Sequence, residues 1–332
     1  MKAAYIEKTG APDVIQYGEL PDPQCGPDQV LLQVGAVSVN PIDTYIRGGA
    51  NYWPLPQPFI IGCDVAGTIL KVGDKVRHLE VGQRVWGSNQ GLLGRQGTFS
   101  SLAAIDAAWL YPTPDNTSDD QAAAIALVGI TARLGLLRDA VLQPGQTIFV
   151  RGGTGGVGSM VVQMAKAVGA TVITTAGSPE KAAQCRQLGA DVVIEYKTQS
   201  VQETLLAFAP SGVHVFWETL RDPDFDLAVS CLTERGTMIL MAGRTARPEF
   251  PVGPFYVKGC SLKGLVMFKA SASEQQVAAS DINHWLINGK LKAKIDRVLP
   301  LSQSAEAHRL QEANTLNGTG CLAGKIVLNP SL

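Results

Sequence analysis

The chain has 332 residues, of which 45% are hydrophobic and 17% are charged, and its formal net charge is -1. This composition is typical of a globular protein with a sizeable core, and the length favours about two domains. Because there is no basic surplus, nucleic acid and anionic membranes are not expected partners. No apolar run approaches the ~18 residues of a membrane span, and the N-terminal residues do not resemble a signal peptide. By default, we therefore expect a cytoplasmic protein.

The first part of the chain, up to about residue 120, is rich in glycine, proline and short β-type runs. Many short strands with few helices favour a compact, barrel-like β domain. A helix is predicted over 118–139, because Ser118 and the acidic residues after it form a typical start and alanine and leucine follow. Strands are predicted between turn signals at 1–8, 30–37, 67–72 and 84–86.

From about residue 145 the pattern changes to an alternation of strands and helices. This alternation is typical of a doubly wound parallel sheet, so we predict an α/β fold for this part. Strands are expected at 148–150, 171–175, 191–196, 213–218, 236–243 and 261–266, and a last strand at 324–328. Helices are expected after the glycine-rich turn at 152–158 and at 179–187, 201–208, 225–232 and 273–288.

The glycine-rich turn follows the first of these strands and opens a helix. Gly153, Gly155 and Gly158 fit the G-x-G-x-x-G spacing. In that motif one glycine permits a tight turn, one lets the backbone approach a pyrophosphate, and one lets helix and strand pack closely. The helix N-terminus would then bind the pyrophosphate through its free N–H groups. A merely structural turn is the alternative. The candidate cofactor-binding residues are Gly153, Thr154, Gly155, Gly156, Val157 and Gly158.

The end of the second strand, Thr174–Lys181, bears on the choice of dinucleotide. NAD-specific sites place an acidic residue directly at this strand end, and no carboxylate stands there. Ser178 offers a hydroxyl and Lys181 a positive charge to a 2′-phosphate, whereas Glu180 would repel it unless it points to solvent. The alternative for Lys181 is a solvated helix charge. We therefore predict NADPH as the cofactor.

Several motifs together resemble the medium-chain dehydrogenases/reductases, and among them the zinc-free quinone oxidoreductases related to zeta-crystallin. The resemblance covers essentially the whole chain. It implies a GroES-like β-barrel catalytic domain with a Rossmann NADP-binding domain inserted, with boundaries at 1–122, 123–263 and 264–332. The motifs are VNPIDTYIRG at 39–48, GCDVAG at 62–67, the valine-glycine turns at 73–85, GITA at 129–132 and GGTGGVG at 152–158.

Zinc-dependent members of this family carry a catalytic cysteine near the position of Asn40 and a Gly-His-Glu run near Gly62. Asn40 and Gly62-Cys63-Asp64 do not reproduce a Cys–His pair, although Cys63 with Asp64 could in principle bind a metal. The six cysteines are scattered without a C-x-x-C pair, so we expect reduced thiols and no zinc lobe. Without a Lewis acid, hydride transfer to an electron-poor acceptor is expected rather than alcohol oxidation.

The resemblance implies that Asn40, Asp43 and Tyr45 line the active cleft, and they are the candidate catalytic residues. Asn40 could bind a substrate carbonyl, and Tyr45 could donate a proton or hold a quinone ring. Alternatively, Asp43 caps a helix start and Tyr45 packs as a core aromatic residue. The resemblance further implies that Thr131 and Tyr196 lie beside the cofactor, with an ordinary helix threonine as the alternative for Thr131. Gly243 and Arg244 follow the fifth predicted strand, where Arg244 is placed to reach the nicotinamide side of the cofactor.

The expected activity is NADPH-dependent reduction of quinones by hydride transfer without a metal. Reduction of an activated double bond, as in an enone or alkenal, is the alternative among enzymes. An NADPH-binding structural or regulatory protein is the alternative from another class. The resemblance also implies a homodimer, in which an apolar edge at 237–241 pairs with its copy, and a tetramer is the alternative.

Overall fold

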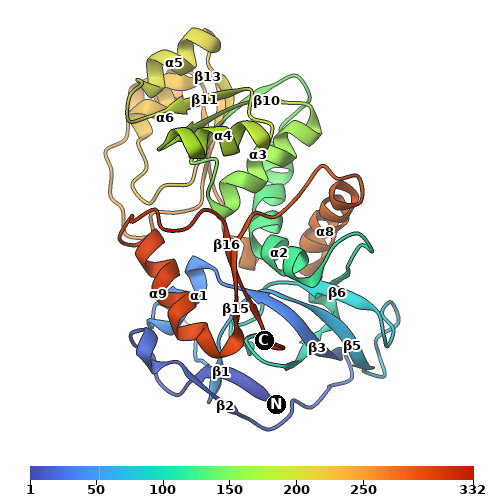
Figure 1. Cartoon of the computed structure of the whole chain (residues 1–332). Coiled ribbons are helices and arrows are strands. Elements are labelled where there is room, and N and C mark those ends of the chain that lie inside the picture. Colours follow the sequence, from blue (N-terminus) through green and yellow to red (C-terminus); the bar gives the residue numbers. More distant parts are fainter. Residues whose placement is uncertain (52) are drawn as a thin grey trace. The chain divides into compact units, whose positions relative to one another are not determined.

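The computed structural model describes residues 1–51 and 53–332, which divide into two compact units (Figure 1). The first unit comprises residues 1–127, 270–287 and 292–332, and the second comprises residues 128–269 and 288–291. The first unit is therefore discontinuous in sequence, with the second unit inserted. The expected boundaries, after residues 122 and 263, lie a few residues before the observed ones.

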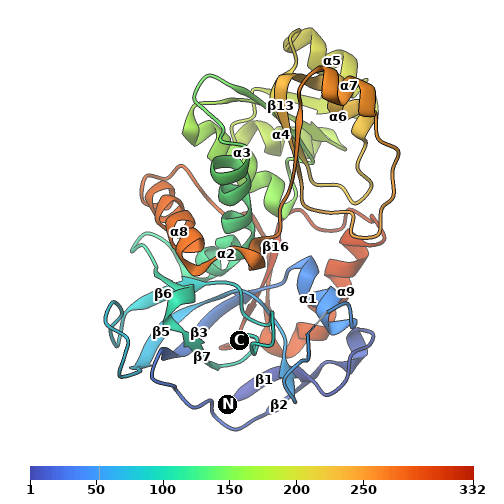
Figure 2. The ribbon, with the colours of Figure 1, turned by 180° about the vertical axis from the view of Figure 1, so that it is seen from behind.

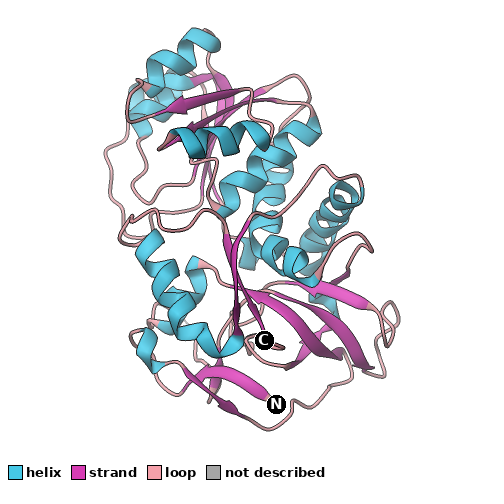
Figure 3. Ribbon diagram, in the orientation of Figure 1, coloured by secondary structure: helices cyan, strands magenta, loops and turns pink. Residues whose placement is uncertain are grey.

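The first unit is built on two β-sheets (Figure 3). Its strands are β1 (Lys2–Ile6), β2 (Gln16–Glu19), β3 (Gln29–Ser38), β4 (Phe59–Ile60), β5 (Val65–Val72), β6 (Arg84–Gly87), β7 (Leu102–Asp106), β8 (Leu110–Pro112), β15 (Ile295–Pro300) and β16 (Lys325–Asn329). Its helices are η1 (Pro12–Val14), α1 (Pro41–Arg47), η2 (Ala107–Trp109), α8 (Ala272–Ile287), η5 (Leu301–Gln303) and α9 (Ser304–Thr315).

Among the described residues, one sheet has the order β2-β1-β4 and the other the order β15-β16-β3-β5-β6-β8, with β7 also paired to β3. In β3, Val30, Leu32 and Val34 are buried at every second position, as one core-facing side of a strand requires. An isolated bridge joins Ala3 of β1 to Ser100, which lies two residues before β7 of the other sheet. The predicted β domain is confirmed, although its described strands form two linked sheets rather than one continuous closed ladder.

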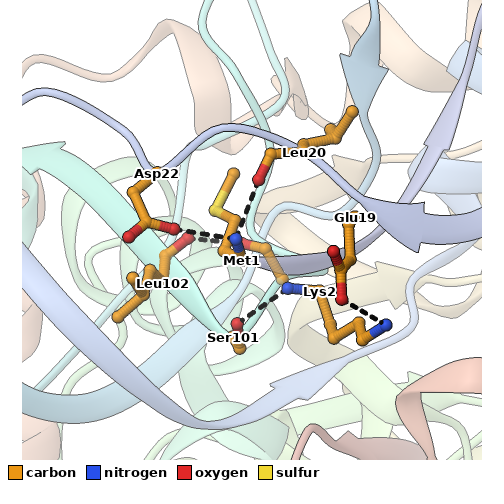
Figure 4. A network of polar contacts seen from close by, with 8 residues as sticks. Met1, Lys2, Glu19, Leu20, Asp22, Ser101 and Leu102 are labelled. Atoms are coloured by element: carbon orange, nitrogen blue, oxygen red, sulfur yellow. Dashed lines mark hydrogen bonds and ion pairs between the residues drawn. The ribbon is translucent and has the colours of Figure 1, made fainter.

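Polar contacts of Met1 and of Lys2, the first residue of β1, hold the N-terminal strand in place (Figure 4). The amino group of Met1 donates to the carbonyl of Leu20 at 2.8 Å. The Lys2 N–H donates to Ser101 Oγ at 3.1 Å, and the Lys2 ammonium lies 2.9 Å from a Glu19 carboxylate oxygen. These contacts join β1 to segments about 20 and about 100 residues away, so the predicted N-terminal strand belongs to the body of the unit.

The second unit contains a six-stranded parallel sheet among its described residues, with the order β11-β10-β9-β12-β13-β14. The strands are β9 (Thr147–Arg151), β10 (Thr171–Ala176), β11 (Val192–Glu195), β12 (Val213–Glu218), β13 (Leu232–Leu240) and β14 (Ser261–Gly264). The order reverses between β9 and β12, as in a doubly wound Rossmann fold. The predicted α/β fold of this part is confirmed.

Helices cover both faces of this sheet. The helical segments that lie wholly within this unit are α3 (Gly156–Val168), α4 (Pro179–Gln187), α5 (Val201–Phe208), α6 (Phe225–Cys231), α7 (Val252–Val257) and η4 (Met267–Lys269). Figure 1 shows α3 and α4 on the side toward the reader, and Figure 2 shows α5, α6 and α7 from behind. The rings of Phe149 and Phe216, 4.8 Å apart, lie in the core that packs against α5 and α6. Burial of these apolar side chains is the main stabilising contribution to the unit.

The expectation about the sheet edge is wrong. Residues 237–240 of β13 pair in parallel with Ser261–Gly264 of β14. The fifth strand is therefore an interior strand, and β14 forms the edge. The sequence suggested a strand near 261–266 but did not show that it would cover the fifth one.

The helix predicted over 118–139 forms with a change of geometry. It is α2 (Asp119–Arg133) followed by a π-helical turn, η3 (Leu134–Asp139). A Cβ atom on Gly135 would lie 2.2 Å from the ring of Trp217, so glycine is needed where the turn meets this buried side chain. Contrary to expectation, the span Asp119–Asp139 is long and apolar enough for a membrane helix, but 72% of its most apolar window is buried in the protein, as in a core helix.

Candidate nucleotide site and active-site residues

The glycine-rich turn between β9 and α3 has a distinct steric constraint at each glycine. Gly152 has a φ of +91°, so the tight turn depends on Gly152, which the G-x-G-x-x-G spacing does not include. A Cβ atom on Gly153 would lie 2.3 Å from Thr174 Oγ1, and one on Gly158 would lie 2.1 Å from the Gly152 carbonyl oxygen. Gly153 and Gly158 therefore allow close packing of the turn, the strand and the helix.

Gly155 is different, because a Cβ atom there would meet no protein atom closer than 3.5 Å. It precedes the first residue of α3, a 13-residue helix whose first N–H groups have no partner within the helix. These donors and the helix dipole favour a negative group at this end. The open side of Gly155 is the place where backbone could approach a pyrophosphate. The turn therefore fits the dinucleotide that its sequence predicts.

The residues expected at the 2′-phosphate lie near the carboxyl end of β10. Ser178 caps α4, and its Oγ accepts a hydrogen bond from the Lys181 N–H at 3.3 Å. A hydrogen bond from Ser178 lowers the pKa of Glu180, whose carboxylate is fully exposed. The hydroxyl of Tyr196 would lie 2.6 Å from a Cβ atom on Gly177. The fold thus brings Ser178, Gly177 and Tyr196 together, with Lys181 on the first turn of α4.

The other residues expected beside the cofactor lie on separate elements of the second unit. Thr131 is almost fully buried in α2. Gly243, after β13, has a φ of +81°, and a Cβ atom there would lie 2.7 Å from the Arg221 carbonyl oxygen. Arg244 follows it and is exposed. Gly243 therefore has a structural reason to be glycine, independent of any ligand.

An ion pair that the sequence did not reveal stands where the sheet order reverses. Arg151 and Glu218 are the last residues of β9 and β12 and are register partners. Arg151 Nη1 lies 2.8 Å from Glu218 Oε2, and the Glu218 side chain is fully buried. Burial raises the pKa of Glu218, and the Arg151 charge and a hydrogen bond from the Leu220 N–H oppose this. Ligands of doubly wound sheets bind outside the strand ends at this point.

In the first unit, a buried polar cluster surrounds Asn40. The Asn40 Nδ2 donates to Asp64 Oδ2 at 2.7 Å, and its Oδ1 accepts from the ammonium group of Lys325. Asn40 is fully buried, so both ends of its amide are engaged inside the unit. A hydrogen bond from Asn40 to a substrate carbonyl would require one of these bonds to break. Sequence patterns around Asn40 do not predict Lys325 as its partner, because Lys325 lies 285 positions away.

Asp64 is the best-satisfied carboxylate of this cluster. Besides Asn40 it accepts hydrogen bonds from Ser38 Oγ and Ser88 Oγ, each at 2.7 Å, and from the Leu127 N–H at 3.0 Å. Burial raises the pKa of Asp64, and the Lys325 charge and the hydrogen bonds from Asn40, Ser88 and Ser38 oppose this shift. Asp64 is therefore an internal acceptor with both oxygens in use.

Asp43 lies on the first turn of α1 and accepts the Asn40 backbone N–H at 2.8 Å, as the predicted helix-capping role requires. Its other oxygen accepts a hydrogen bond from the Cys63 thiol at 2.8 Å. Burial raises the pKa of Asp43 to about 7, and burial and the nearby carboxylates raise the pKa of Cys63. Tyr45, also on α1, is only half-buried and so is the most accessible of the three candidate catalytic residues.

The donor set at the zinc positions of related enzymes does not fit a metal. Asn40 contacts an ammonium group, and the Cys63 thiol keeps its proton in a hydrogen bond to Asp43. A zinc site needs deprotonated Cys, neutral His or carboxylate ligands converging on one point. Within residues 1–51 and 53–332, no group of three or more His, Cys, Asp or Glu side chains is placed to hold a metal ion.

Comparison with known proteins bears on both units. The alcohol dehydrogenase GroES-like domain matches residues 26–115, and the zinc-binding dehydrogenase family matches residues 156–282. The quinone oxidoreductase of Sus scrofa is 31% identical over 310 residues, which cover 93% of each chain.

Solved structures extend the comparison over the whole chain. The Escherichia coli quinone oxidoreductase complexed with NADPH has a TM-score of 0.85 at 27% identity, covering 99% of this chain and 100% of that one. A 2-haloacrylate reductase has a TM-score of 0.84 at 28% identity, with 100% of both chains covered. The fold of the whole chain thus has structural counterparts among these enzymes.

Proposed function

The chain belongs to the quinone oxidoreductase family of the medium-chain dehydrogenases/reductases, and we propose that it is an enzyme that reduces quinones with NADPH. The observation that carries this proposal is the turn at 152–158, in which Gly152, Gly153 and Gly158 are sterically required and Gly155 is left open. Such a turn leaves the start of α3 accessible to a pyrophosphate. The NADPH complex of the E. coli relative supports the same cofactor.

The chain's own residues would act mainly by binding and orientation. NADPH, when bound, supplies the hydride that reduces the acceptor. The α3 N-terminus would hold the pyrophosphate, and Thr131, Gly243 and Arg244 are proposed to lie beside the dinucleotide. Tyr45 is proposed to hold the acceptor, on a helix that Asn40 and Asp43 fix at its start. Holding two reactants in a productive geometry alone can supply a large part of the rate enhancement.

We propose NADPH rather than NADH because the region after β10 suits a 2′-phosphate. Ser178 and Lys181 stand on the first turn of α4, and the Tyr196 hydroxyl lies against Gly177. A helix N-terminus with a serine cap and a lysine favours a phosphate dianion. The exposed Glu180 opposes phosphate binding at this place. Its carboxylate accepts the hydrogen bond that the Ser178 hydroxyl would otherwise donate to the phosphate.

Reduction of an activated double bond is a second candidate, favoured by the structural likeness to a 2-haloacrylate reductase. The test is the rate of NADPH oxidation by the purified protein with a p-quinone, with an α,β-unsaturated ketone and with no acceptor. A quinone rate far above the other two supports the proposal. A faster enone rate would favour the second candidate, and binding of NADPH without turnover of either acceptor would favour a non-catalytic binding protein.

We also propose that the protein is a homodimer paired through β14. This strand is the edge of the second unit's sheet, and an unpaired edge needs a partner or a cover. Exposed apolar side chains accompany it, with Tyr256 and Val257 of α7 70% and 75% exposed and Leu262 of β14 38% exposed. Isologous pairing would cover them. Light scattering should give at least twice the 35.2 kDa of one chain, and a monomer mass at micromolar concentration would refute the pairing.

We propose a cytoplasmic location because the cysteines are free thiols. All six are free, two of them at least partly accessible, and none is placed in a disulfide. Free thiols persist where the compartment is reducing. Fractionation of cells that make the protein would test this, and recovery outside the cytoplasmic fraction would contradict it.

A further inference from the structure

Lys325 carries a buried positive charge for which the reaction proposed above gives no reason. Its side chain is nearly inaccessible, and its Nζ donates to the Val39 carbonyl at 2.9 Å and to Asn40 Oδ1. We propose that Lys325 is a positioning residue for quinone reduction: it clamps the Asn40 amide and thereby fixes the start of α1, which carries Tyr45. This inference rests on the proposed function and adds a residue to it.

The register of the strands explains why a lysine near the end of the chain reaches Asn40. β16 runs antiparallel to β3, with Val327 opposite Ser38. Continued by two residues, the same register places position 325 opposite position 40. The strand β16 therefore places the Lys325 side chain beside Asn40, which lies between the end of β3 and the start of α1.

The two ends of the Asn40 amide meet opposite charges. Its oxygen accepts from the Lys325 ammonium group, and its nitrogen donates to the Asp64 carboxylate at 2.7 Å. If the amide were flipped, the NH₂ group would face an ammonium group and the oxygen would face a carboxylate, and both contacts would be repulsive. The pair therefore permits a single orientation of the side chain.

The backbone of Asn40 connects its fixed side chain to α1. The Asn40 N–H donates to Asp43 Oδ2 at 2.8 Å, which closes the first turn of the helix. Tyr45 lies two residues further along the same seven-residue helix. A short helix has little stability of its own, so contacts at its start determine where its side chains stand.

The charges of the cluster depend on one another. Burial lowers the pKa of Lys325, while Asp64, Asp43 and Cys63 oppose this shift. Removing one partner of a buried pair leaves the other uncompensated and is strongly destabilising. Replacing both Lys325 and Asp64 by neutral residues of similar size would keep the charge balanced and still remove the clamp.

The experiment compares Lys325→Met, the double variant Lys325→Met/Asp64→Asn, Asn40→Ala and, as a control, Lys71→Met at an exposed lysine of the same unit. Four quantities are measured: the Tm without substrate, the NADPH Kd, and the kcat and KM for a p-quinone. We expect the single Lys325 variant to lose roughly 5 °C or more in Tm and the double variant to regain most of it.

In the double variant we expect kcat to stay at least about tenfold below wild type, with the NADPH Kd unchanged, because the Tyr45 helix is no longer held in register. Recovery of kcat together with Tm would show that Lys325 only balances charge and would overturn the proposal. An unchanged Tm in Lys325→Met would overturn it as well. If neither Lys325 variant folds, Asn40→Ala decides: a loss of kcat supports the clamp, and a wild-type kcat overturns it.

The failure of this inference can be told apart from failure of the proposed function. A wild-type protein that does not reduce quinones would contradict the function. The coupling of Lys325 and Asp64 in Tm needs no substrate, and it would still show whether the cation and the carboxylate depend on each other.

Discussion

The thiol of Cys63 donates a hydrogen bond to the carboxylate of Asp43 across 2.8 Å, in a fully buried part of the first unit. The same carboxylate accepts the Asn40 backbone N–H. The carboxylate is removed from water, and the two groups that donate hydrogen bonds to it are uncharged. Its ionised form is therefore poorly solvated, and burial raises the pKa of Asp43 to about 7.

Stability should therefore fall with rising pH on account of Asp43. A carboxyl group whose pKa is raised on folding binds its proton more tightly in the folded state, so its stabilising effect is full below the unfolded pKa and is lost as pH rises to about 7. Asp43→Asn removes this effect. Between about pH 5 and pH 8, the free energy of unfolding of wild type should fall by roughly 2–3 kcal/mol relative to that of Asp43→Asn. Denaturant unfolding at both pH values measures the difference, and parallel pH profiles would contradict it.

The glycines of the nucleotide turn should separate folding from binding. Gly158→Ala forces a Cβ atom against the Gly152 carbonyl oxygen, so both Tm and NADPH affinity should fall. Gly155→Ala meets no protein atom closer than 3.5 Å, so its Tm should stay near wild type. Its NADPH affinity should still fall about tenfold or more, because the backbone can no longer approach the pyrophosphate. If Gly155→Ala binds NADPH with wild-type affinity, the pyrophosphate does not bind against the backbone at Gly155.

Lys181 should discriminate NADPH from NADH. A charge-assisted contact to a phosphate is worth roughly 1.5–3 kcal/mol, which is about a ten- to hundredfold change in affinity. Lys181→Ala should weaken NADPH binding by about that factor and leave NADH binding nearly unchanged. Arg186→Ala, an exposed charge in the last turn of the same helix, is the matched control. Equal losses for both cofactors in a fluorescence titration would show that the phosphate site lies elsewhere.

Glu180 should act in the opposite direction. Its exposed carboxylate accepts a hydrogen bond from Ser178, so it holds the hydroxyl away from a phosphate and adds a negative charge nearby. Glu180→Gln should therefore tighten NADPH binding about two- to fivefold, which is the size of an exposed charge interaction. The effect should weaken at high salt and be absent with NADH. Weaker NADPH binding in this variant would be contrary to the account.

The features that the sequence predicted well depend on local patterns. The strand–helix alternation from 147 to 232 and the G-x-G-x-x-G spacing are readable because each strand and helix carries its own periodicity and its own turn residues. Two helices were not predicted: α7 has only six residues, and α9 begins after a 3-10 turn without a side-chain cap. The seven-residue α1 was predicted only as a helix start capped by Asp43. Gly152 belongs to the glycine-rich run at 152–158, but it received no role because the G-x-G-x-x-G spacing does not include it.

The contacts that define the two sites could not be predicted, because they depend on the fold. Lys325 meets Asn40 only through the register of β16 on β3. Arg151 meets Glu218 only because β9 and β12 are neighbours in the sheet. The covering of β13 by β14 likewise depends on the path of the chain after residue 240. The local sequence at each of these positions does not predict which residue or strand it will contact.

The central claim is NADPH-dependent quinone reduction without a metal. The most direct test dialyses the purified protein against a strong chelator, measures its metal content, and then records NADPH oxidation with a p-quinone and the same rate with NADH. We predict a kcat/KM within about twofold of the untreated protein and at least about tenfold higher with NADPH than with NADH. A loss of activity that zinc restores, or the absence of quinone-dependent NADPH oxidation, would contradict the account.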